Sequence, residues 1–187
     1  PCGHGKRANS AMTLAPNRRQ EMLRVDHAGE YGAVAIYRGQ LAVFERQHGK
    51  ERIIGQLKGM AAEEQDHLDA FDKMLAAGHV RPTALSPVWN AAGFALGAAT
   101  ALLGEKAAHA CTEAVETVIE EHYAAQIAEV QTERPELAAD LSRFRDEELS
   151  HKDQAVAEGA LDAPGYPLLA GLIRAGCRAA IKISERI

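Results

Sequence analysis

The chain contains an internal repeat, and this repeat constrains its fold more than any other feature of the sequence. Residues 30–42 and 116–128 each begin with Glu, carry Tyr seven positions later and Gln ten positions later, and continue with an aliphatic residue and Ala. Residues 63–69 and 147–153 both read Glu-Glu-x-x-His-x-Asp. The lone Glu precedes the second Glu of that pattern by 34 residues in the first copy and by 32 in the second. The repeat therefore predicts two copies of one helical hairpin.

The residue usage and the positions of proline and glycine predict helices throughout. Ala is abundant and runs of β-branched residues are scarce, which favours helix over sheet. We expect a first helix from just after Pro16-Asn17 to about His48-Gly49, and a second from Glu51 to Ala77, ended by Gly78. Later helices are expected at about residues 105–132, 135–159 and 168–186, with a loop at 162–167. The prediction is an all-α four-helix bundle with two additional amphipathic or hydrophobic helices.

A length of 187 residues suits one domain with a substantial core. We expect that domain at residues 17–187, built from the two hairpin repeats, after a flexible tail at residues 1–16. The tail is either a plain extension or the remnant of a transit peptide, and Cys2 and His4 are expected to belong to it rather than to a metal site. The first 20 residues lack the apolar core of a secretory signal.

Charge and cysteine usage exclude some classes of function. The formal net charge of −5 provides no basic surface for general nucleic-acid binding, so no nucleic-acid partner is expected. The three cysteines, Cys2, Cys111 and Cys177, are few and far apart, which is not a disulfide framework. This usage is typical of a reducing compartment.

The two Glu-x-x-His pairs are candidate metal ligands. Residues three apart lie on one face of a helix, so Glu64 and His67 point at one spot, as do Glu148 and His151. Mixed oxygen and nitrogen ligands suit iron or manganese. Two such pairs with two further glutamates are typical of di-iron and di-manganese helical bundles. We therefore predict a dinuclear site whose ligands, also the catalytic residues, are Glu30, Glu64, His67, Glu116, Glu148 and His151.

Other glutamates compete for these places. Glu63 and Glu147 stand four residues before the histidines, and residues four apart also share a helix face. Spacing alone leaves that choice open, and we prefer the three-residue spacing because di-iron bundles use it. Glu113, Glu120 and Glu121 compete with Glu116, which the repeat alignment selects. One Glu-x-x-His pair alone would equally describe a solvated helix face, whereas two in repeat register favour metal.

Four further polar residues have two interpretations each. Asp26 lies one turn before Glu30, and His122 lies six residues after Glu116, so either orients a metal ligand or is an ordinary polar residue. Tyr37 and Tyr123 lie two turns after the lone glutamates on the same faces. They either line a substrate cavity or fill the core.

Two segments suggest contact with a membrane. Residues 82–104 carry no charge, which raises three alternatives: a transmembrane span, an interfacial helix, or a helix that gates access for a substrate. The last helix carries Arg174, Arg178, Lys182 and Arg186 at intervals of four, with apolar residues between them. Such a helix either lies in a bilayer interface or belongs to the bundle with a solvated basic face. We expect a peripheral enzyme that takes a lipid-like substrate from the membrane surface.

Several longer motifs resemble one known family. They lie at residues 25–33, 89–97, 110–116, 144–151, 175–178 and 184–186. These segments, and the chain from about residue 18 to its last residue, resemble the 5-demethoxyubiquinone hydroxylases of ubiquinone biosynthesis. The resemblance implies a ferritin-like di-iron monooxygenase that uses O2 to hydroxylate the ring of a demethoxy-ubiquinol. Its iron ligands fall on the six residues predicted above, and all six are present, which implies two bound Fe²⁺ ions.

The resemblance also implies partners and a location. NADH or the quinol itself is the expected reductant, since the chain shows no G-x-G-x-x-G motif of its own. Family members lie on the cytoplasmic face of the bacterial inner membrane or the matrix face of the mitochondrial inner membrane, and in mitochondria they work with a lipid-binding partner protein. The short leader of this chain favours the bacterial case.

Two other functions compete with this one. A ferritin-like or rubrerythrin-like protein that oxidises iron would share the ligands, but would not need the basic last helix or the uncharged segment. Rubrerythrins usually add a cysteine-rich site, which three scattered cysteines do not supply. A purely structural, membrane-associated bundle would leave the acidic residues solvated and would carry no iron.

Overall fold

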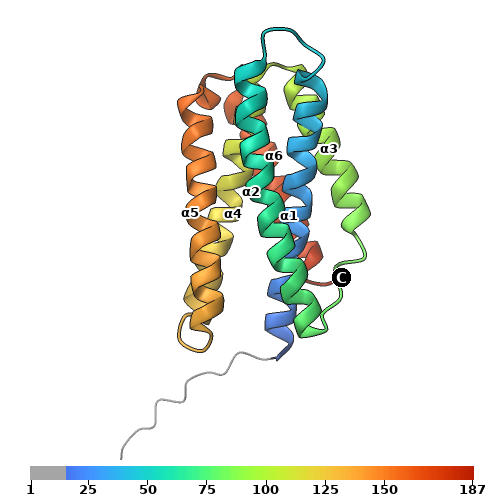
Figure 1. Ribbon diagram of the computed structural model, residues 1–187, viewed down its shortest axis with the longest axis vertical. Helices are drawn as coiled ribbons and strands as arrows, with labels where there is room; N and C mark the ends of the chain where they lie inside the picture. The colour runs from blue at the N-terminus through green and yellow to red at the C-terminus, as the bar shows by residue number, and fades with distance from the viewer. Residues whose placement is uncertain (1–15) are drawn as a thin grey trace, which may run out of the picture.

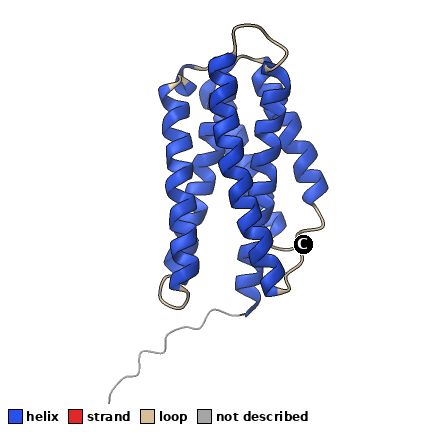
Figure 2. Cartoon of the chain, in the orientation of Figure 1, coloured by secondary structure: helices blue, strands red, loops and turns tan. Residues whose placement is uncertain are grey.

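The structure is a computed structural model that describes residues 16–187, and these form six α-helices, one short 3-10 helix and no strand (Figure 2). The helices are α1 (Pro16–Phe44), α2 (Glu51–Gly78), α3 (Ser86–Leu102), α4 (Glu105–Val130), α5 (Pro135–Ala157), the 3-10 helix η1 (Ala160–Asp162) and α6 (Tyr166–Ser184). The prediction of an all-α fold is confirmed. Residues 1–15, with Cys2 and His4, lie outside the described residues.

The helices α1, α2, α4 and α5 form an antiparallel four-helix bundle (Figure 1). Each hairpin of the repeat is followed by a third helix that packs along the first helix of its own copy. Thus α3 lies along α1, and α6 lies along α4. Further contacts of α3 with α4 and of α6 with α1 place both added helices on the α1/α4 side of the bundle. The α2/α5 side has no such cover within the described part of the chain.

The core is divided into two main apolar clusters along the bundle. One contains Leu23 and Phe71 with Phe144, and the other contains Phe44 with Leu57, all of them buried. Along α1 the first cluster precedes residue 30 and the second follows it. Burial of these side chains stabilises the fold by roughly 1.5–3 kcal/mol each. The polar ligand candidates therefore lie between two well-packed apolar layers.

Details at three helix ends differ from the predictions. The helix α1 ends at Phe44 rather than near Gly49, because the chain turns back through residues 45–49 and Gly49 takes a left-handed φ of 73°. The helix α2 ends at Gly78 as predicted, but the left-handed residue that follows it is His79, with φ 51°. The helix α6 begins at Tyr166 rather than residue 168, because Pro167 fits the first turn of a helix, where no N–H is needed.

The uncharged segment forms α3, which packs very closely on α1. A methyl group at Gly97 would overlap the backbone carbonyl of Ile36, and one at Gly93 would lie 2.6 Å from the carbonyl oxygen of Gly32. Only glycine allows two helix backbones to approach so closely. This packing fixes α3 against α1.

Candidate membrane spans can be assessed for every described helix. Within residues 16–187, no helix combines the length and hydropathy that crossing a bilayer requires.

We predict that Gly97→Ala destabilises the fold, because the added methyl group forces the backbones of α1 and α3 apart. The free energy of unfolding should fall by about 1–3 kcal/mol, the usual cost of overpacking. Gly55→Ala on α2 is the matched control, because its new methyl group meets nothing within 4 Å. The control should gain up to about 1 kcal/mol from helix propensity. Urea unfolding of both variants checks this, and equal stabilities would contradict the packing described.

Candidate metal centre

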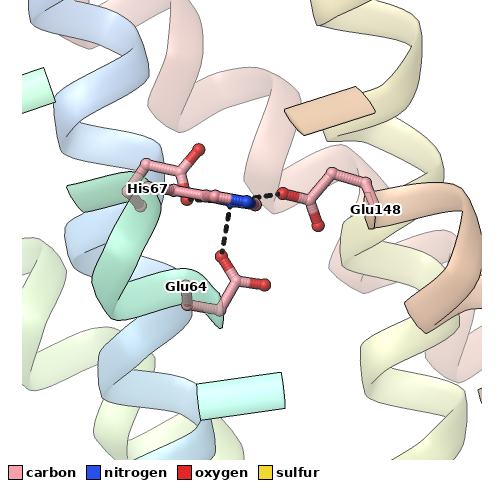
Figure 3. A group of neighbouring side chains, drawn as sticks. Glu64, His67 and Glu148 are labelled. Carbon is pink, nitrogen blue, oxygen red and sulfur yellow. Dashed lines mark ion pairs between the residues drawn. The ribbon is translucent and has the colours of Figure 1, made fainter. Parts of the chain in front are cut away.

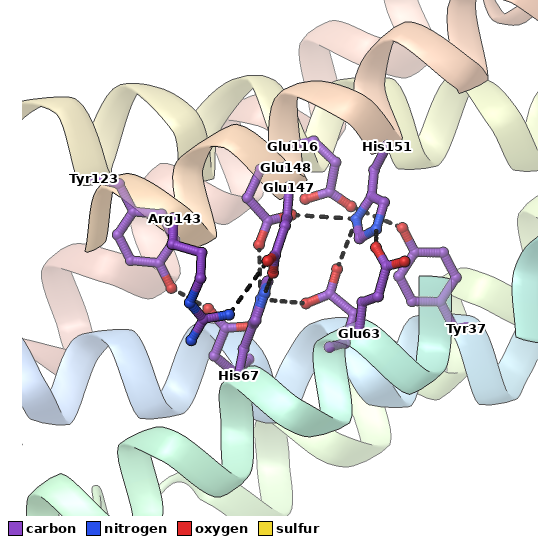
Figure 4. Close-up of polar contacts among 11 residues, drawn as sticks. Tyr37, Glu63, His67, Glu116, Tyr123, Arg143, Glu147, Glu148 and His151 are labelled. Atoms are coloured by element: carbon purple, nitrogen blue, oxygen red, sulfur yellow. Dashed lines mark hydrogen bonds and ion pairs between the residues drawn. The ribbon is translucent and has the colours of Figure 1, made fainter. Parts of the chain in front are cut away.

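The six predicted ligands come together midway along the four-helix bundle. The helices α1 and α4 each supply the lone glutamate, and α2 and α5 each supply a Glu-x-x-His pair, one face of each helix pointing inward (Figures 3 and 4). All six side chains are buried: Glu30, Glu64, His67, Glu116, Glu148 and His151. Burial of four acids and two imidazoles in one place is costly unless cations offset the charge.

These residues divide into two overlapping groups of potential ligands. One group is Glu30, Glu64, His67 and Glu148, and the other is Glu64, Glu116, Glu148 and His151. In each group, one ligand atom per residue lies within 4.8 Å of the others. Glu64 and Glu148 belong to both groups, so their carboxylates are placed between the two positions. The arrangement suits two metal ions that share two bridging carboxylates.

The imidazole nitrogens Nδ1 face the carboxylates. Nδ1 of His67 lies 3.2 Å from Oε1 of Glu148 and 3.5 Å from Oε2 of Glu30. Nδ1 of His151 lies 3.2 Å from Oε1 of Glu64 and 3.4 Å from Oε2 of Glu148. Both Nδ1 atoms are therefore directed at the centre of the site.

The inward-facing atoms have the character of metal ligands. Among the described residues, one or both carboxylate oxygens of all four glutamates and both Nδ1 atoms are buried without any hydrogen-bond partner. Native proteins rarely leave so many buried polar atoms unpaired. Four carboxylates carry four negative charges, which two divalent cations would balance, so the donor set fits two such ions.

In the absence of cations, the site holds protons. Burial opposes charge on His67, but the carboxylates of Glu148 and Glu30 outweigh it and raise the pKa of His67 to about 11. For His151, burial is likewise outweighed, here by Glu148 and Glu64, and its pKa rises to about 12. Burial, reinforced by the negative charge of Glu148, raises the pKa of Glu64 and Glu116 well above the usual value. These protons must leave before metal ions bind.

We predict that loading with Fe²⁺ releases at least two protons per chain, one from each imidazole. Because the pKa of both imidazoles is raised to 11 or more, both are protonated in the metal-free chain throughout the neutral range. Affinity should therefore rise with pH, by about 100-fold per unit for the overall binding of two ions. Anaerobic calorimetry in buffers of different ionisation enthalpy measures the release. Affinity that stays constant with pH would contradict this protonation state.

Glu63 and Glu147, the rival ligands, lie outside the two groups. The carboxylate of Glu63 lies 2.7 Å from Nε2 of His151, and the carboxylate of Glu147 contacts Nε2 of His67 (Figure 4). Each glutamate thus binds the outer nitrogen of the histidine from the other copy of the repeat. Such a partner fixes the tautomer and the ring orientation of a metal-binding histidine.

The two tyrosines also connect the copies. Tyr37 on α1 donates a hydrogen bond of 2.9 Å to Glu116 on α4, and Tyr123 on α4 donates one to Glu30 on α1. Burial, with the negative charge of these glutamates, raises the pKa of both phenols, so they remain donors. Neither tyrosine lines the large cavity described below, so the core interpretation of the two is correct and each also orients a candidate ligand.

Asp26 and His122 contact each other rather than the six candidate ligands. Oδ1 of the buried Asp26 lies 3.1 Å from Nε2 of His122 and accepts a 2.7 Å hydrogen bond from Gln126. Burial raises the pKa of Asp26, although His122 and Gln126 oppose the shift. This pair therefore forms a polar cluster next to the centre, between α1 and α4.

The rivals of Glu116 all have other partners. Glu120 accepts hydrogen bonds from Arg145 and Lys152, at 2.9 and 3.2 Å. Glu113 accepts from Tyr166 at 2.8 Å and from Arg174 at 2.7 Å, and Glu121 accepts from Arg178 at 2.9 Å. The choice of Glu116 by repeat alignment therefore agrees with the geometry. Two of the three basic residues of α6, Arg174 and Arg178, thus bind α4, whereas Arg186 of the predicted series lies beyond the end of α6.

A large apolar cavity of about 590 Å³ lies beside the centre, between α1, α3, α4 and α6. Its walls include Gly29 and Val115, the residues that immediately precede Glu30 and Glu116. Its few polar groups are Cys177, Trp89 and Ser184. The indole N–H of Trp89 donates to Ser184 at 3.1 Å and so joins the start of α3 to the end of α6. Sequence reasoning did not identify this cavity, because its walls are ordinary small and aliphatic residues.

Comparison with known proteins places the chain among enzymes of one kind. It is 52% identical to the 3-demethoxyubiquinol 3-hydroxylase of Rhodospirillum rubrum over 165 residues, which cover 88% of this chain and 76% of that protein. It is 48% identical to the mitochondrial NADPH-dependent 3-demethoxyubiquinone 3-hydroxylase of Mus musculus, covering 95% of this chain and 83% of the mouse protein. The mitochondrial 5-demethoxyubiquinone hydroxylase of Saccharomyces cerevisiae is 37% identical, covering 89% and 77%. Residues 17–184 match the family described as "Ubiquinone biosynthesis protein COQ7", and the chain therefore belongs to that family.

Proposed function

We propose that this protein is a di-iron monooxygenase that uses O2 to hydroxylate the ring of a demethoxy-ubiquinol in ubiquinone biosynthesis. The observation that carries the proposal is a buried site of four carboxylates and two imidazoles beside an apolar cavity of about 590 Å³. Membership of the family and the names of its relatives supply the reaction.

The cofactor in this proposal is a pair of iron ions. Glu30 and His67 would hold one ion, Glu116 and His151 would hold the other, and Glu64 and Glu148 would contribute to both positions, because they belong to both ligand groups. When bound, the ions would supply the reductive activation of O2. Tyr37 and Tyr123 would keep the terminal carboxylates in place through their hydrogen bonds.

The cavity is the proposed site for the substrate. Its apolar walls suit a prenylated ring and exclude water from the side of the centre formed by α1 and α4. The ring would lie near Gly29 and Val115, next to the candidate ligands. Electrons must come from outside the chain. The names of mitochondrial relatives specify NADPH, whereas the sequence resemblance implied NADH or the quinol, so a reduced nicotinamide is the donor class to test.

A group of exposed leucines supports the proposal that the protein binds peripherally to the surface of a membrane. Five leucines, each 52–74% exposed, lie in the segments where α3 ends and where η1 and α6 begin. These helix ends lie at the same end of the bundle (Figure 1). We call the five leucines the leucine patch: Leu102, Leu103, Leu161, Leu168 and Leu172. Leu172 also lines the cavity, so the patch continues into the proposed substrate site. A prenyl tail would pass from the bilayer into the cavity along this route.

We predict that the double variant Leu103→Ser, Leu168→Ser binds vesicles of anionic phospholipid at least about tenfold more weakly, because two apolar side chains no longer enter the bilayer. Sedimentation with vesicles measures the partition. Val156→Ser, which changes an exposed apolar residue of α5 outside the patch, is the control. If the double variant and the control bind vesicles equally well, the leucine patch is not the membrane contact.

The proposed reaction is tested by supplying the iron-loaded protein with a demethoxy-ubiquinol, a reduced nicotinamide and ¹⁸O2. The product should carry one ¹⁸O atom on the ring, as shown by mass spectrometry. In parallel, a strain lacking the enzyme should accumulate the demethoxy-quinone and clear it when this chain is expressed. A ferritin-like protein would oxidise added Fe²⁺ but form no hydroxylated quinol, and that outcome would overturn the proposal in favour of iron oxidation.

A further inference from the structure

The two halves of the centre are alike in their inner residues but differ in their outer residues. On the outer side, Glu63 binds Nε2 of His151 and Glu147 binds Nε2 of His67. Since Nδ1 of each ring faces the centre, Nε2 carries the proton and donates it to the glutamate. A negatively charged acceptor in this position makes the opposite nitrogen a stronger metal ligand.

Only one of these glutamates also contacts a cation. Nη1 of Arg143 lies 3.2 Å from Oε1 of Glu147, one turn along α5 (Figure 4). Its guanidinium lies over the ring of Phe144, 4.4 Å from the ring centroid. Among the described residues, Glu63 has no partner other than His151. In the repeat alignment that pairs Glu63 with Glu147, the position of Arg143 is occupied by Gly59 on α2. The two copies of the repeat therefore differ in sequence at the position that supplies the cation.

The contact with Arg143 changes the electrostatic effect of Glu147 on His67. The guanidinium of Arg143 partly neutralises the carboxylate of Glu147. That carboxylate therefore polarises the imidazole of His67 less strongly. Glu63 contacts no cation among the described residues, so only solvent, to which its side chain is 53% exposed, moderates its charge toward His151. The contact is half-exposed, with the side chain of Arg143 53% and that of Glu147 33% exposed, so solvent moderates the effect but does not remove it.

From this difference we infer that the two metal positions are unequal: the position formed with His151 binds its ion more tightly than the position formed with His67. The inference rests on the di-iron centre of the proposed function and adds an order of occupation to it. Outer partners of metal-binding histidines typically change affinity by about 10–100-fold. Because Glu147 is shared between His67 and Arg143, we expect the difference in affinity to lie near the lower limit of that range.

The test is stepwise anaerobic binding of Fe²⁺ to the metal-depleted full chain, followed by competition with a chelator. The wild-type protein should give two dissociation constants that differ by about tenfold. Arg143→Gln should strengthen the weaker site and reduce the ratio. Gly59→Arg, which places a cation one turn before Glu63 where nothing lies within 4 Å, should weaken the tighter site and also reduce the ratio. Gly59→Ala is the matched control and should leave the ratio unchanged.

Two further readouts separate this inference from other effects. Thermal unfolding of metal-free Arg143→Gln should stay near that of the wild type, because Arg143 is exposed. Gly59→Arg and Gly59→Ala should share a small gain in stability from the loss of a helix glycine, so each is compared with the other. Mössbauer spectra of protein loaded with one equivalent of ⁵⁷Fe should show one dominant site in the wild type and two populated sites in Arg143→Gln. A ratio near one in the wild type would overturn the inequality, and a tenfold ratio that neither Arg143→Gln nor Gly59→Arg changes would overturn its origin in Arg143. Either result leaves the proposed hydroxylation intact. Failure of hydroxylation, with the predicted ratios observed, would overturn only the proposed function.

Discussion

Glu148→Ala is expected to remove both iron ions and abolish hydroxylation. Its carboxylate belongs to both ligand groups, so its loss weakens both positions at once. Wild-type protein should contain about two irons per chain and the variant less than about 0.2. The variant should show no measurable turnover, and plasma emission analysis with a hydroxylation assay measures both quantities.

Two controls accompany Glu148→Ala. Asp153→Ala alters an exposed acid on the same helix that belongs to neither group, and it should keep its iron and its activity. Glu30→Ala removes a residue of one group only and should retain about one iron per chain, held between the residues of the other group. Full iron content in Glu148→Ala would show that this carboxylate is not a bridging ligand.

The second large effect is expected from Gly176→Phe, which should block the cavity without disturbing the metal. Gly176 lines the cavity from α6, and a Cβ placed there meets nothing within 4 Å, so a substitution does not overlap the fold at its Cβ. An aromatic ring would then occupy the space proposed for the quinol. Turnover should fall by about 100-fold, as misplacement of a reacting group commonly costs. Iron content and the free energy of unfolding should remain near the wild-type values.

Gly171→Phe provides the matched control for the cavity. Gly171 also lies on α6 with open space around its Cβ position, but it does not line the cavity. Its activity should remain within about twofold of the wild type, since an exposed substitution outside the site leaves transition-state binding unchanged. If Gly176→Phe hydroxylates as fast as Gly171→Phe, the quinol binds elsewhere.

The fold and the inner site were predictable because both depend on periodicity. The repeat placed one lone glutamate and one Glu-x-x-His pair in each hairpin, and helix geometry directed each pair to one spot. Glu64 and His67 could be predicted from that spacing and from the matching pair in the other copy of the repeat. The end of α1 was placed five residues too late because helix propensity alone does not report where residues 45–49 turn back toward α2.

The outer residues depend on distances between helices, which the sequence does not contain. Glu63 lies four residues before His67 and therefore shares a helix face with it, as a ligand would. Only the position of α5 shows that the carboxylate of Glu63 meets the outer nitrogen of His151. Arg174 fitted a basic face directed at lipid, yet it makes a partly buried contact with Glu113 on α4. The cavity was hidden for a similar reason, since residues such as Gly176 show no pattern that separates a cavity wall from a packed core.

The central claim is that six side chains from four helices hold two iron ions at one place. The most direct measurement is anomalous X-ray scattering at the iron edge from crystals of the iron-loaded protein. Two peaks per chain are predicted: one among Glu30, Glu64, His67 and Glu148, and one among Glu64, Glu116, Glu148 and His151. A single peak, or iron bound elsewhere while these side chains bond to one another, would contradict the account.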